Sequence, residues 1–397
     1  MEEGSVFGYN KENNISTEVG TCSPDHSVAT EDVVAPDTST AEPGACSEGR
    51  ASDHGATLSS AVQSPETENK EFIDEFGFLI DEEELNMELK HVKGAHSELT
   101  ARREKRWRMV ANWEATNTRN REKLKSLCRK GIPRLFRSGT WQLLLGSYVH
   151  ILDPVDKGVY EVLREKDIAN KELKEIISRD VSRTFTKHIM YREAGGAGQT
   201  LLRNVLHAYA CADPEVGYVQ GMGFVVCTLS TQMNEVETFW ALHTLMKNEK
   251  HRMREMYRPG FPMLHQQFYQ LRRLMAKLLP RLYKHFETLG VSPPLYASQW
   301  FLTLFVCDLE FRAVLRVWDV FMSEGWKIIF RIAIALLKWE ERRLLSMPFD
   351  EVIPAMKTLH QGKDSDELLQ RAHNVRFKTA ELEAFAREFA SSQVSGG

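Results

Sequence analysis

The stretch Ile177-Ser-Arg-Asp180-Val-Ser-Arg183-Thr184 lies within residues 172–187, where apolar residues recur at three- and four-residue spacing. That period is typical of an amphipathic helix, so we predict a helix over 172–187. Asp180 and Arg183 are three residues apart, which makes them neighbours on the helix surface and permits an ion pair. Outside any motif, an arginine in such a position is usually one more charge on a solvated helix face.

A second stretch, Gly217-Tyr218-Val-Gln220-Gly221-Met222, follows one further predicted helix at 199–212. Pro214 ends that helix, so the second stretch is expected to form an irregular turn. Tyr218 and Gln220 are two residues apart and would project to the same side of an extended segment. The flanking glycines leave room for a close approach to a ligand. The alternative is that both side chains only satisfy nearby backbone groups.

An isolated arginine and a glycine-flanked glutamine suit the hydrolysis of GTP. Its transition state spreads negative charge over the transferred phosphoryl group, which a planar guanidinium stabilises. A carboxamide accepts a hydrogen bond from water and donates one to phosphate, so it can hold the attacking water in line. The sequence contains no Gly-x-Ser-x-Gly elbow, His-Glu-x-x-His motif, dinucleotide fingerprint or paired Cys/His framework that would indicate other chemistry.

Further motifs surround these two stretches in a fixed order. They are Gly131-Ile-Pro-Arg134-Leu-Phe-Arg137-Ser-Gly-Thr-Trp141, Asp213-Pro-Glu-Val-Gly217, Ala297-Ser-Gln299-Trp300-Phe-Leu-Thr-Leu-Phe305 and Trp318-Asp319-Val-Phe321. Over about residues 131–340 the sequence resembles the TBC-domain GTPase-activating proteins of Rab-type small GTPases. It departs from the family pattern at Thr186, where proline is frequent, and at Gly223, where asparagine is frequent.

The resemblance implies a protein that docks on a GTP-bound Rab-family GTPase, stimulates its GTP hydrolysis and so regulates vesicle trafficking. Arg183 would be the arginine finger, and Gln220 would orient water in place of the GTPase's own glutamine. The protein would need no cofactor or metal, because GTP and Mg²⁺ are carried by the partner. It would activate an enzyme in trans rather than hydrolyse a substrate alone. The alternatives are a Rab-binding scaffold with weak or no activity and a helical adaptor unrelated to GTPases.

The resemblance also assigns supporting roles near the two fingers. Asp180 and Arg137 would orient the finger helix through hydrogen bonds, and Trp141 would pack against it. Tyr218 would shape the glutamine loop, and Thr184 is a further supporting residue.

Composition divides the chain unevenly. Residues 1–70 hold thirteen acidic and three basic residues and almost no large apolar side chains, so we predict a disordered acidic tail. The remainder is mildly basic, which suits an acidic partner surface or a phosphate-bearing ligand but not nucleic acid. After the tail we predict an aromatic lead-in with basic helices over 71–125. A TBC domain over 126–345 and C-terminal helices over 346–397 complete the organisation.

The rest of the sequence indicates helices and no convincing strand, so the predicted fold class is all-α, and the resemblance implies a two-lobed irregular helical domain. The segment 72–80 is either an aromatic strip packed on the body or a docking peptide for a partner. Gly195-Gly196-Ala-Gly198 is expected to be a flexible connector, and Asp319 to pair within the fold. Other predicted helices include one capped by Ser97 and ending near 113, and others over 295–306 and 366–390.

The six cysteines show no C-x-x-C spacing and are interpreted as reduced thiols of a cytosolic protein. The N-terminus has no secretory pattern, and the longest apolar stretch, 328–339, is interrupted by Arg331 and Lys338, so no transmembrane segment is expected. We therefore predict a cytoplasmic protein that is recruited peripherally to endomembranes through its partner. The sequence does not encode a readable choice of Rab, because a broad protein interface sets that specificity.

Overall fold

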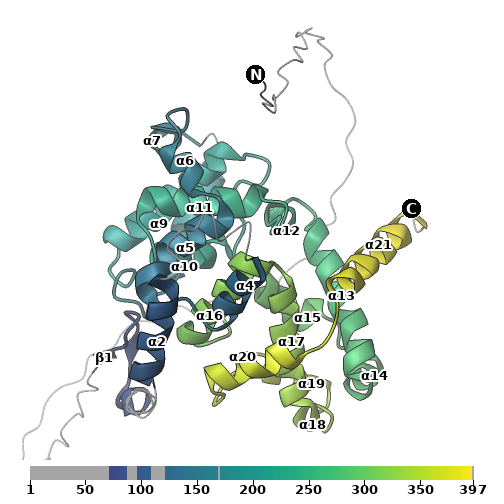
Figure 1. The fold of residues 1–397 in the computed structure, drawn as a ribbon. Helices are drawn as coiled ribbons and strands as arrows, with labels where there is room; N and C mark the ends of the chain where they lie inside the picture. The colour runs from purple at the N-terminus through teal and green to yellow at the C-terminus, as the bar shows by residue number, and fades with distance from the viewer. Residues whose placement is uncertain (1–70, 87–95, 109–120, 169, 396–397) are drawn as a thin grey trace, which may run out of the picture. The chain divides into compact units, whose positions relative to one another are not determined.

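The computed structural model describes residues 71–86, 96–108, 121–168 and 170–395 of this protein (Figure 1). The acidic tail predicted for residues 1–70 lies outside these ranges. Within them the regular secondary structure is helical apart from one two-stranded ribbon. The predicted all-α fold class is confirmed. No helix in the described ranges has both the length and the apolar character that crossing a membrane requires.

The first group of helices is drawn from dark blue to teal in Figure 1. It comprises α2 (His96–Arg108), α4 (Arg121–Arg129), α5 (Arg134–Leu145), α6 (Tyr148–Leu152), α7 (Val159–Glu165), α8 (Lys171–Arg183), α9 (Ala197–Ala212), α10 (Met222–Ser230), α11 (Glu235–Lys247) and α12 (Arg254–Tyr257). Helix α9 is central to this group, because it contacts α7, α8, α10 and α11. Helix α2 begins one residue before Ser97, which is therefore not its N-cap.

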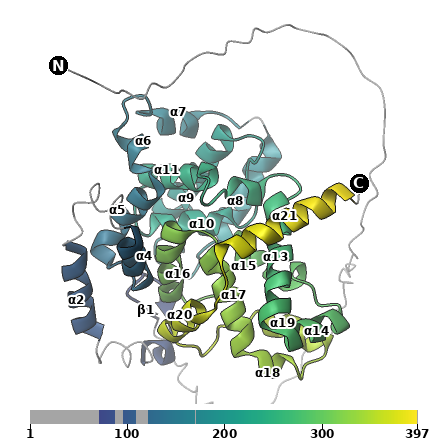
Figure 2. The same ribbon diagram turned by 45° about the vertical axis from the view of Figure 1, so that its right-hand side comes forward.

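The second group follows in green to yellow. It comprises α13 (Pro262–Leu278), α14 (Pro280–Leu289), α15 (Pro294–Leu302), α16 (Phe311–Glu324), α17 (Lys327–Trp339), α18 (Glu341–Leu344), α19 (Phe349–Met356), α20 (Ser365–Asn374) and α21 (Thr379–Ser395). Helix α17 contacts α13, α16, α18 and α20, and α21 lies beside α13 (Figure 2). The two groups meet where α16 contacts α4 and α5, and where α12 contacts α13. The single helix predicted over 366–390 is two helices, α20 and α21.

A buried carboxylate joins the two groups. Asp319 on α16 is completely buried and accepts hydrogen bonds from the backbone N–H of Ile132 at 2.7 Å, Trp141 Nε1 at 2.9 Å and Arg137 Nε at 3.1 Å. A buried carboxylate is stable when charged donors and hydrogen bonds surround it in this way. The predicted pairing of Asp319 within the fold is confirmed.

The aromatic lead-in forms a small hairpin that the sequence pattern did not indicate. Strands β1 (Phe72–Ile73) and β2 (Leu79–Ile80) pair antiparallel. The Asp74 carboxylate accepts from the backbone N–H groups of Phe76 and Phe78 at 2.9 and 2.7 Å, which closes the turn. Two-residue strands are too short to produce an alternating pattern of apolar and polar residues, so no strand was predicted.

This hairpin packs on the helical body. The Phe78 ring lies 5.3 Å from the Phe185 ring and 4.9 Å from the Phe311 ring, measured between centroids. His188 Nε2 donates a hydrogen bond to the carbonyl of Phe76 at 2.9 Å. Of the two interpretations of this segment, the strip packed on the body is the one observed. Its contact with Phe185 places it against the chain just after α8.

The glycine-rich segment before α9 is only partly a connector. Gly195 has a positive φ of 73°, as a turn requires. Gly198, however, is buried inside α9, and a Cβ atom there would lie 2.0 Å from the carbonyl oxygen of Met190. The prediction of a flexible connector is therefore wrong for Gly198, which is a close-packing position between α9 and the chain that follows α8.

Two helices end earlier than their sequence patterns predict. Helix α8 ends at Arg183 rather than at residue 187, because Thr184 is extended with ψ of 128° and Phe185 then adopts a left-handed conformation with φ of 55°. Helix α15 ends at Leu302, shortly before Leu304 and Phe305, whose φ values are 52° and 65°. Positive φ values cannot continue a right-handed helix, so apolar periodicity alone overestimates both lengths.

Candidate active site

The two signature stretches meet at one surface cavity. Its volume is about 670 Å³, and its lining includes Asp180, Arg183, Thr184, Tyr218 and Gln220. These are five of the seven residues that the sequence singled out. Helix α8 supplies the arginine from its last residue, and the loop between α9 and α10 supplies the glutamine. The cavity therefore presents a guanidinium and a carboxamide together.

Arg183 is held by a buried carboxylate while its side chain stays 58% exposed. It forms an ion pair with Asp180, as the three-residue spacing predicted. Asp180 also accepts a hydrogen bond from Tyr218 Oη at 2.6 Å. Burial, and then the hydrogen bond to Asp180, raise the pKa of the Tyr218 phenol well above its ordinary value, so it remains a donor. Asp180 thus links the arginine helix to the glutamine loop.

Tyr218 and Gln220 differ in exposure, although both line the cavity. Tyr218 is buried, whereas Gln220 is exposed. Gly217 and Gly221 on either side have φ values of 57° and 108°, which other residues rarely adopt. A Cβ atom at Gly221 would lie 3.6 Å from Leu302 Cβ, so the loop runs close to the end of α15. These backbone conformations leave Gln220 accessible from the cavity.

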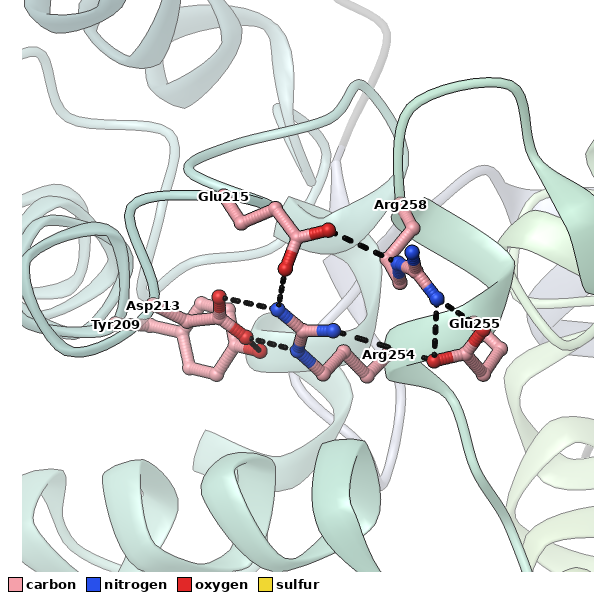
Figure 3. Close-up of polar contacts among 6 residues, drawn as sticks. All are labelled: Tyr209, Asp213, Glu215, Arg254, Glu255 and Arg258. Carbon is pink, nitrogen blue, oxygen red and sulfur yellow. Dashed lines mark hydrogen bonds and ion pairs between the residues drawn. The ribbon is translucent and has the colours of Figure 1, made fainter. Parts of the chain in front are cut away.

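A network of ion pairs holds the start of the glutamine loop (Figure 3). Arg254 on α12 donates from Nε to Asp213 Oδ2 at 2.6 Å and from Nη2 to Asp213 Oδ1 at 3.0 Å. Its Nη2 also donates to Glu215, and Arg258 Nε donates to the same carboxylate at 3.1 Å. Tyr209 Oη donates to Asp213 Oδ2 at 3.2 Å. The first two acidic residues of the loop are therefore tied to α12.

We call this network of ion pairs the Arg254 brace. Its electrostatics favour the ionised form of the Asp213 carboxyl. Burial acts to raise the pKa of Asp213, but the hydrogen bonds and charge of Arg254 outweigh it, so the pKa of this carboxyl is lowered. Helix α12 is tied on its other side by Tyr257 Oη, which donates to the carbonyl of Leu302 at 2.6 Å. One short helix thus connects the glutamine loop to the end of α15. Sequence reasoning missed Arg254, because nothing in its local pattern marks it.

The two remaining predicted residues do not line the cavity. Arg137 donates to Asp319 and, from Nη2, to the carbonyl of Ile132 at 2.6 Å, and the Trp141 indole also donates to Asp319. None of these bonds reaches α8. The predicted role of Arg137 in orienting the finger helix by hydrogen bonds is therefore corrected: both side chains fasten α5 to α16.

The cavity includes further residues that were not predicted as functional. Phe261, at the start of α13, and Leu302, at the end of α15, lie in its wall, together with exposed Gln299. A Cβ atom at Gly223 would have ordinary contacts with Thr184 and with Tyr218 Oη. Among the described residues, no group of three His, Cys, Asp or Glu side chains is arranged to hold a metal ion.

The part of the chain that contains these residues is similar to known proteins. The model of the Rab-GTPase-TBC domain family matches residues 135–345, which include both signature stretches. This chain belongs to the RabGAP-TBC family. The TBC domain of a Chlamydomonas flagellar RabGAP is similar in structure, with a TM-score of 0.60 and 26% sequence identity. That similarity covers 76% of this chain and 98% of the Chlamydomonas chain, so the two-lobed TBC fold is established for this RabGAP-TBC protein.

The sequence is also similar to those of curated proteins. The human Ecotropic viral integration site 5 protein homolog is 33% identical over 309 residues, which is 75% of this chain and 36% of the relative. The Caenorhabditis elegans Rab GTPase-activating protein tbc-11 is 32% identical over 291 residues, which is 71% of this chain and 30% of the relative. This TBC-domain chain therefore spans about a third of the length of these two curated relatives.

Proposed function

We propose that this protein stimulates GTP hydrolysis by a GTP-bound Rab-family GTPase, with Arg183 and Gln220 as its two fingers. The observation that carries the proposal is that an exposed arginine and an exposed glutamine line one cavity. Membership of the RabGAP-TBC family and the name of the tbc-11 relative support the choice of a Rab as partner. As part of the proposal, the protein works in the cytoplasm, reaches endomembranes through its partner and regulates vesicle trafficking.

In this mechanism the partner carries GTP and Mg²⁺, and the protein adds charge and orientation. The Arg183 guanidinium stabilises the negative charge that spreads over the transferring phosphoryl group. When Arg183 turns toward the phosphate, Asp180 keeps the hydrogen bond from Tyr218. A buried carboxylate that loses its only partner would be costly, so this second donor lowers the cost of releasing the arginine.

Gln220 acts on the water. Its carboxamide oxygen accepts a hydrogen bond from the attacking water while its NH₂ group donates to phosphate, which aligns the water with the phosphorus atom. Because the side chain is exposed on a loop that is braced at its start by α12, it can enter the partner's site without first being released from a buried contact. It then replaces the GTPase's own water-positioning glutamine.

A Rab-binding scaffold without useful activity is the competing function. A single-turnover hydrolysis assay against a panel of GTP-loaded Rab proteins separates the two. We expect acceleration of at least one Rab by several orders of magnitude, since an arginine finger contributes roughly 10³ to 10⁵ in rate. Binding to a GTP-analogue-loaded Rab without acceleration would favour the scaffold, and failure to bind any Rab would favour an unrelated adaptor.

A further inference from the structure

The chain that follows Arg183 leaves α8 through a strained residue. Thr184 is buried and extended, and its hydroxyl donates to the carbonyl of Asp180 at 2.6 Å. Phe185 comes next and has a φ of 55°. This conformation costs a bulky side chain free energy, so it persists only where the surroundings compensate for it. The place of Arg183 at the end of α8 therefore depends on what holds Phe185.

Aromatic rings surround the side chain of Phe185. Its ring centroid lies 5.3 Å from that of Phe78, 5.8 Å from Tyr191, 5.9 Å from Phe311 and 6.0 Å from Phe224. Inclined ring pairs at such distances are favourable beyond the burial of their surface. We call these five residues the aromatic cluster. Phe78 is its member from the lead-in hairpin, outside the residues 135–345 that match the family.

Backbone hydrogen bonds join the hairpin to the same segment. The Leu79 N–H donates to the carbonyl of Lys187 at 2.8 Å, and the Ile189 N–H donates to the carbonyl of Gly77 at 2.9 Å. Gly77 has a φ of 99°, and a Cβ atom there would lie 2.9 Å from His188 Nε2. The turn of the hairpin is thus fitted closely to the chain that follows α8.

The hairpin also contacts the start of α16. Glu75 forms an ion pair with Arg312 at 2.6 Å, and the Arg312 guanidinium lies over the Phe76 ring, 5.6 Å from its centroid. The Phe76 ring lies 5.7 Å from the ring of Phe311, the first residue of α16. Cys307, four residues earlier, lines the cavity. The hairpin therefore connects the chain after α8 to an element that begins beside the cavity.

We propose that Phe78 is a positioning residue for Arg183, because its ring holds Phe185 in the left-handed conformation that ends α8. This inference rests on the proposed function. The Arg183 side chain is 58% exposed, so its position is set by its backbone and by its ion pair with Asp180. It has to reach a phosphoryl group on another protein, and a misplacement of about 1 Å can reduce such a rate by about 10²-fold.

The sequence itself shows what happens when Phe185 is released. The apolar period of α8 continues to residue 187, so the local pattern favours a longer helix than the one observed. Without the ring of Phe78, α8 lengthens past Thr184 and Arg183 becomes an interior residue of the helix. Its guanidinium then points along a different direction from the helix surface. The unit that positions Arg183 thus begins at the hairpin, before the residues that match the family.

The test compares Phe78→Ala with Ile73→Ala, which changes a 55% exposed residue of the same hairpin. Single-turnover hydrolysis by a responsive Rab is followed at increasing concentrations of the full chain, well below the melting temperature of each variant. We expect Phe78→Ala to lower the rate at saturation by about tenfold or more, with the half-saturating concentration little changed. Ile73→Ala should match the unaltered protein. Partial unfolding would raise the half-saturating concentration instead and leave the rate at saturation unchanged.

A double substitution shows whether Phe78 acts through Arg183. In an Arg183→Ala background, adding Phe78→Ala should cause little further loss of the saturating rate, because the side chain that Phe78 positions is already absent. Phe78→Leu keeps most of the apolar volume and provides the same comparison if Phe78→Ala does not fold; it should lower the rate by a smaller factor.

A saturating rate equal to that of the unaltered protein in Phe78→Ala and Phe78→Leu would overturn the positioning role. An equal fold loss with and without Arg183 would also overturn it, since Phe78 would then act on another part of the site. If the unaltered protein accelerates no Rab at all, the proposed function fails, and this inference fails with it.

Discussion

Arg183 and Gln220 each lie at or next to the boundary of a helix. Arg183 is the last residue of α8, and Gln220 directly precedes the left-handed Gly221. At such positions a side chain can be exposed while its neighbours are buried, and here the buried neighbours are Asp180 and Tyr218. The two side chains are thus exposed next to buried neighbours.

Replacing Arg183 should remove catalysis but not binding. We expect Arg183→Ala to lose roughly 10³ or more of the stimulated rate, with affinity for the GTP-analogue-loaded Rab largely kept. Arg183→Lys should also fail, because an ammonium group lacks the planar fork. Arg179→Ala, on the exposed face of the same helix, is the matched control. Single-turnover rates near those of the unaltered protein in Arg183→Ala would remove this assignment.

Replacing Gln220 should have a consequence that is visible on the partner. Gln220→Ala should slow hydrolysis strongly, whereas Gln361→Ala at an exposed position elsewhere should not. A Rab whose own water-positioning glutamine is changed to leucine should still respond to the unaltered protein, because Gln220 supplies that group. If this Rab shows no stimulated hydrolysis, the glutamine role is wrong even where Arg183 proves essential.

At the scale of elements, helix α12 determines where the glutamine loop lies. Its four residues contact the start of the loop through Arg254 and the end of α15 through Tyr257. A helix this short has little stability alone, so these bonds fix its place and that of the loop. Side-chain contacts, not local propensity, therefore set the geometry here.

Disrupting the Arg254 brace should therefore slow catalysis more than it weakens binding. We expect Arg254→Gln to reduce the saturating rate by about 10- to 100-fold, because a displacement of about 1 Å is enough for such a loss. Arg254→Lys should recover only part of it, since one ammonium cannot replace the two-bond contact with Asp213. Arg272→Gln breaks a comparable ion pair with Glu287 between α13 and α14 and is the control. A loss confined to affinity would contradict the brace.

The positions of helices could be predicted from the sequence, but their ends and some of their side-chain contacts could not. The period of apolar residues located α8 and α9. The predicted end of α8 was wrong because Thr184 is extended and Phe185 is left-handed, which the apolar period does not record. Arg183 and Gln220 were singled out by motifs, whereas Arg254 bonds to Asp213, which is distant in sequence, and leaves no signature in its local pattern.

At the scale of the whole molecule, the lead-in hairpin and the acidic tail should behave differently. Deleting residues 1–65, which have little apolar content, should leave the melting temperature and the rate nearly unchanged. Extending the deletion through Ile80 should lower the melting temperature by several degrees, because Phe185 and Phe311 lose the ring of Phe78. Melting curves of both truncations, with Phe78→Ala in the full chain, check this. A drop of several degrees with the short deletion would show that the tail contributes to the fold.

Buried histidines should make the folded protein sensitive to acid. Burial lowers the pKa of His243 to about 4 and that of His251 to about 3, from an ordinary 6.5. Below pH 6.5 the unfolded chain therefore takes up protons that the folded chain does not, so the free energy of unfolding falls as pH drops toward 4. Burial raises the pKa of Asp308 to about 7 and also raises the pKa of Asp319, and both carboxyls oppose the trend. Other carboxyls with lowered pKa values, such as Asp213, act in the same direction as the histidines.

This trend is checked by melting the protein between pH 7.5 and pH 5, where we expect the melting temperature to fall. His243→Phe removes one titrating group from the ring cluster with Trp240 and His150, so the fall should become shallower. His265→Phe, at an exposed position, should leave the slope unchanged. A slope that is equal in all three proteins would exclude His243 as a cause.

The close approach of Gly198 to the Met190 carbonyl predicts that substitutions at position 198 are harmful. Any side chain at this position would push α9 away from the chain that leaves Arg183, because its first carbon would overlap a backbone oxygen that cannot turn aside. A single-nucleotide change that replaces this glycine would then lower the amount of folded protein in the cell, although it alters neither Arg183 nor Gln220. A ranking of variants by their distance from Arg183 and Gln220 would pass over it.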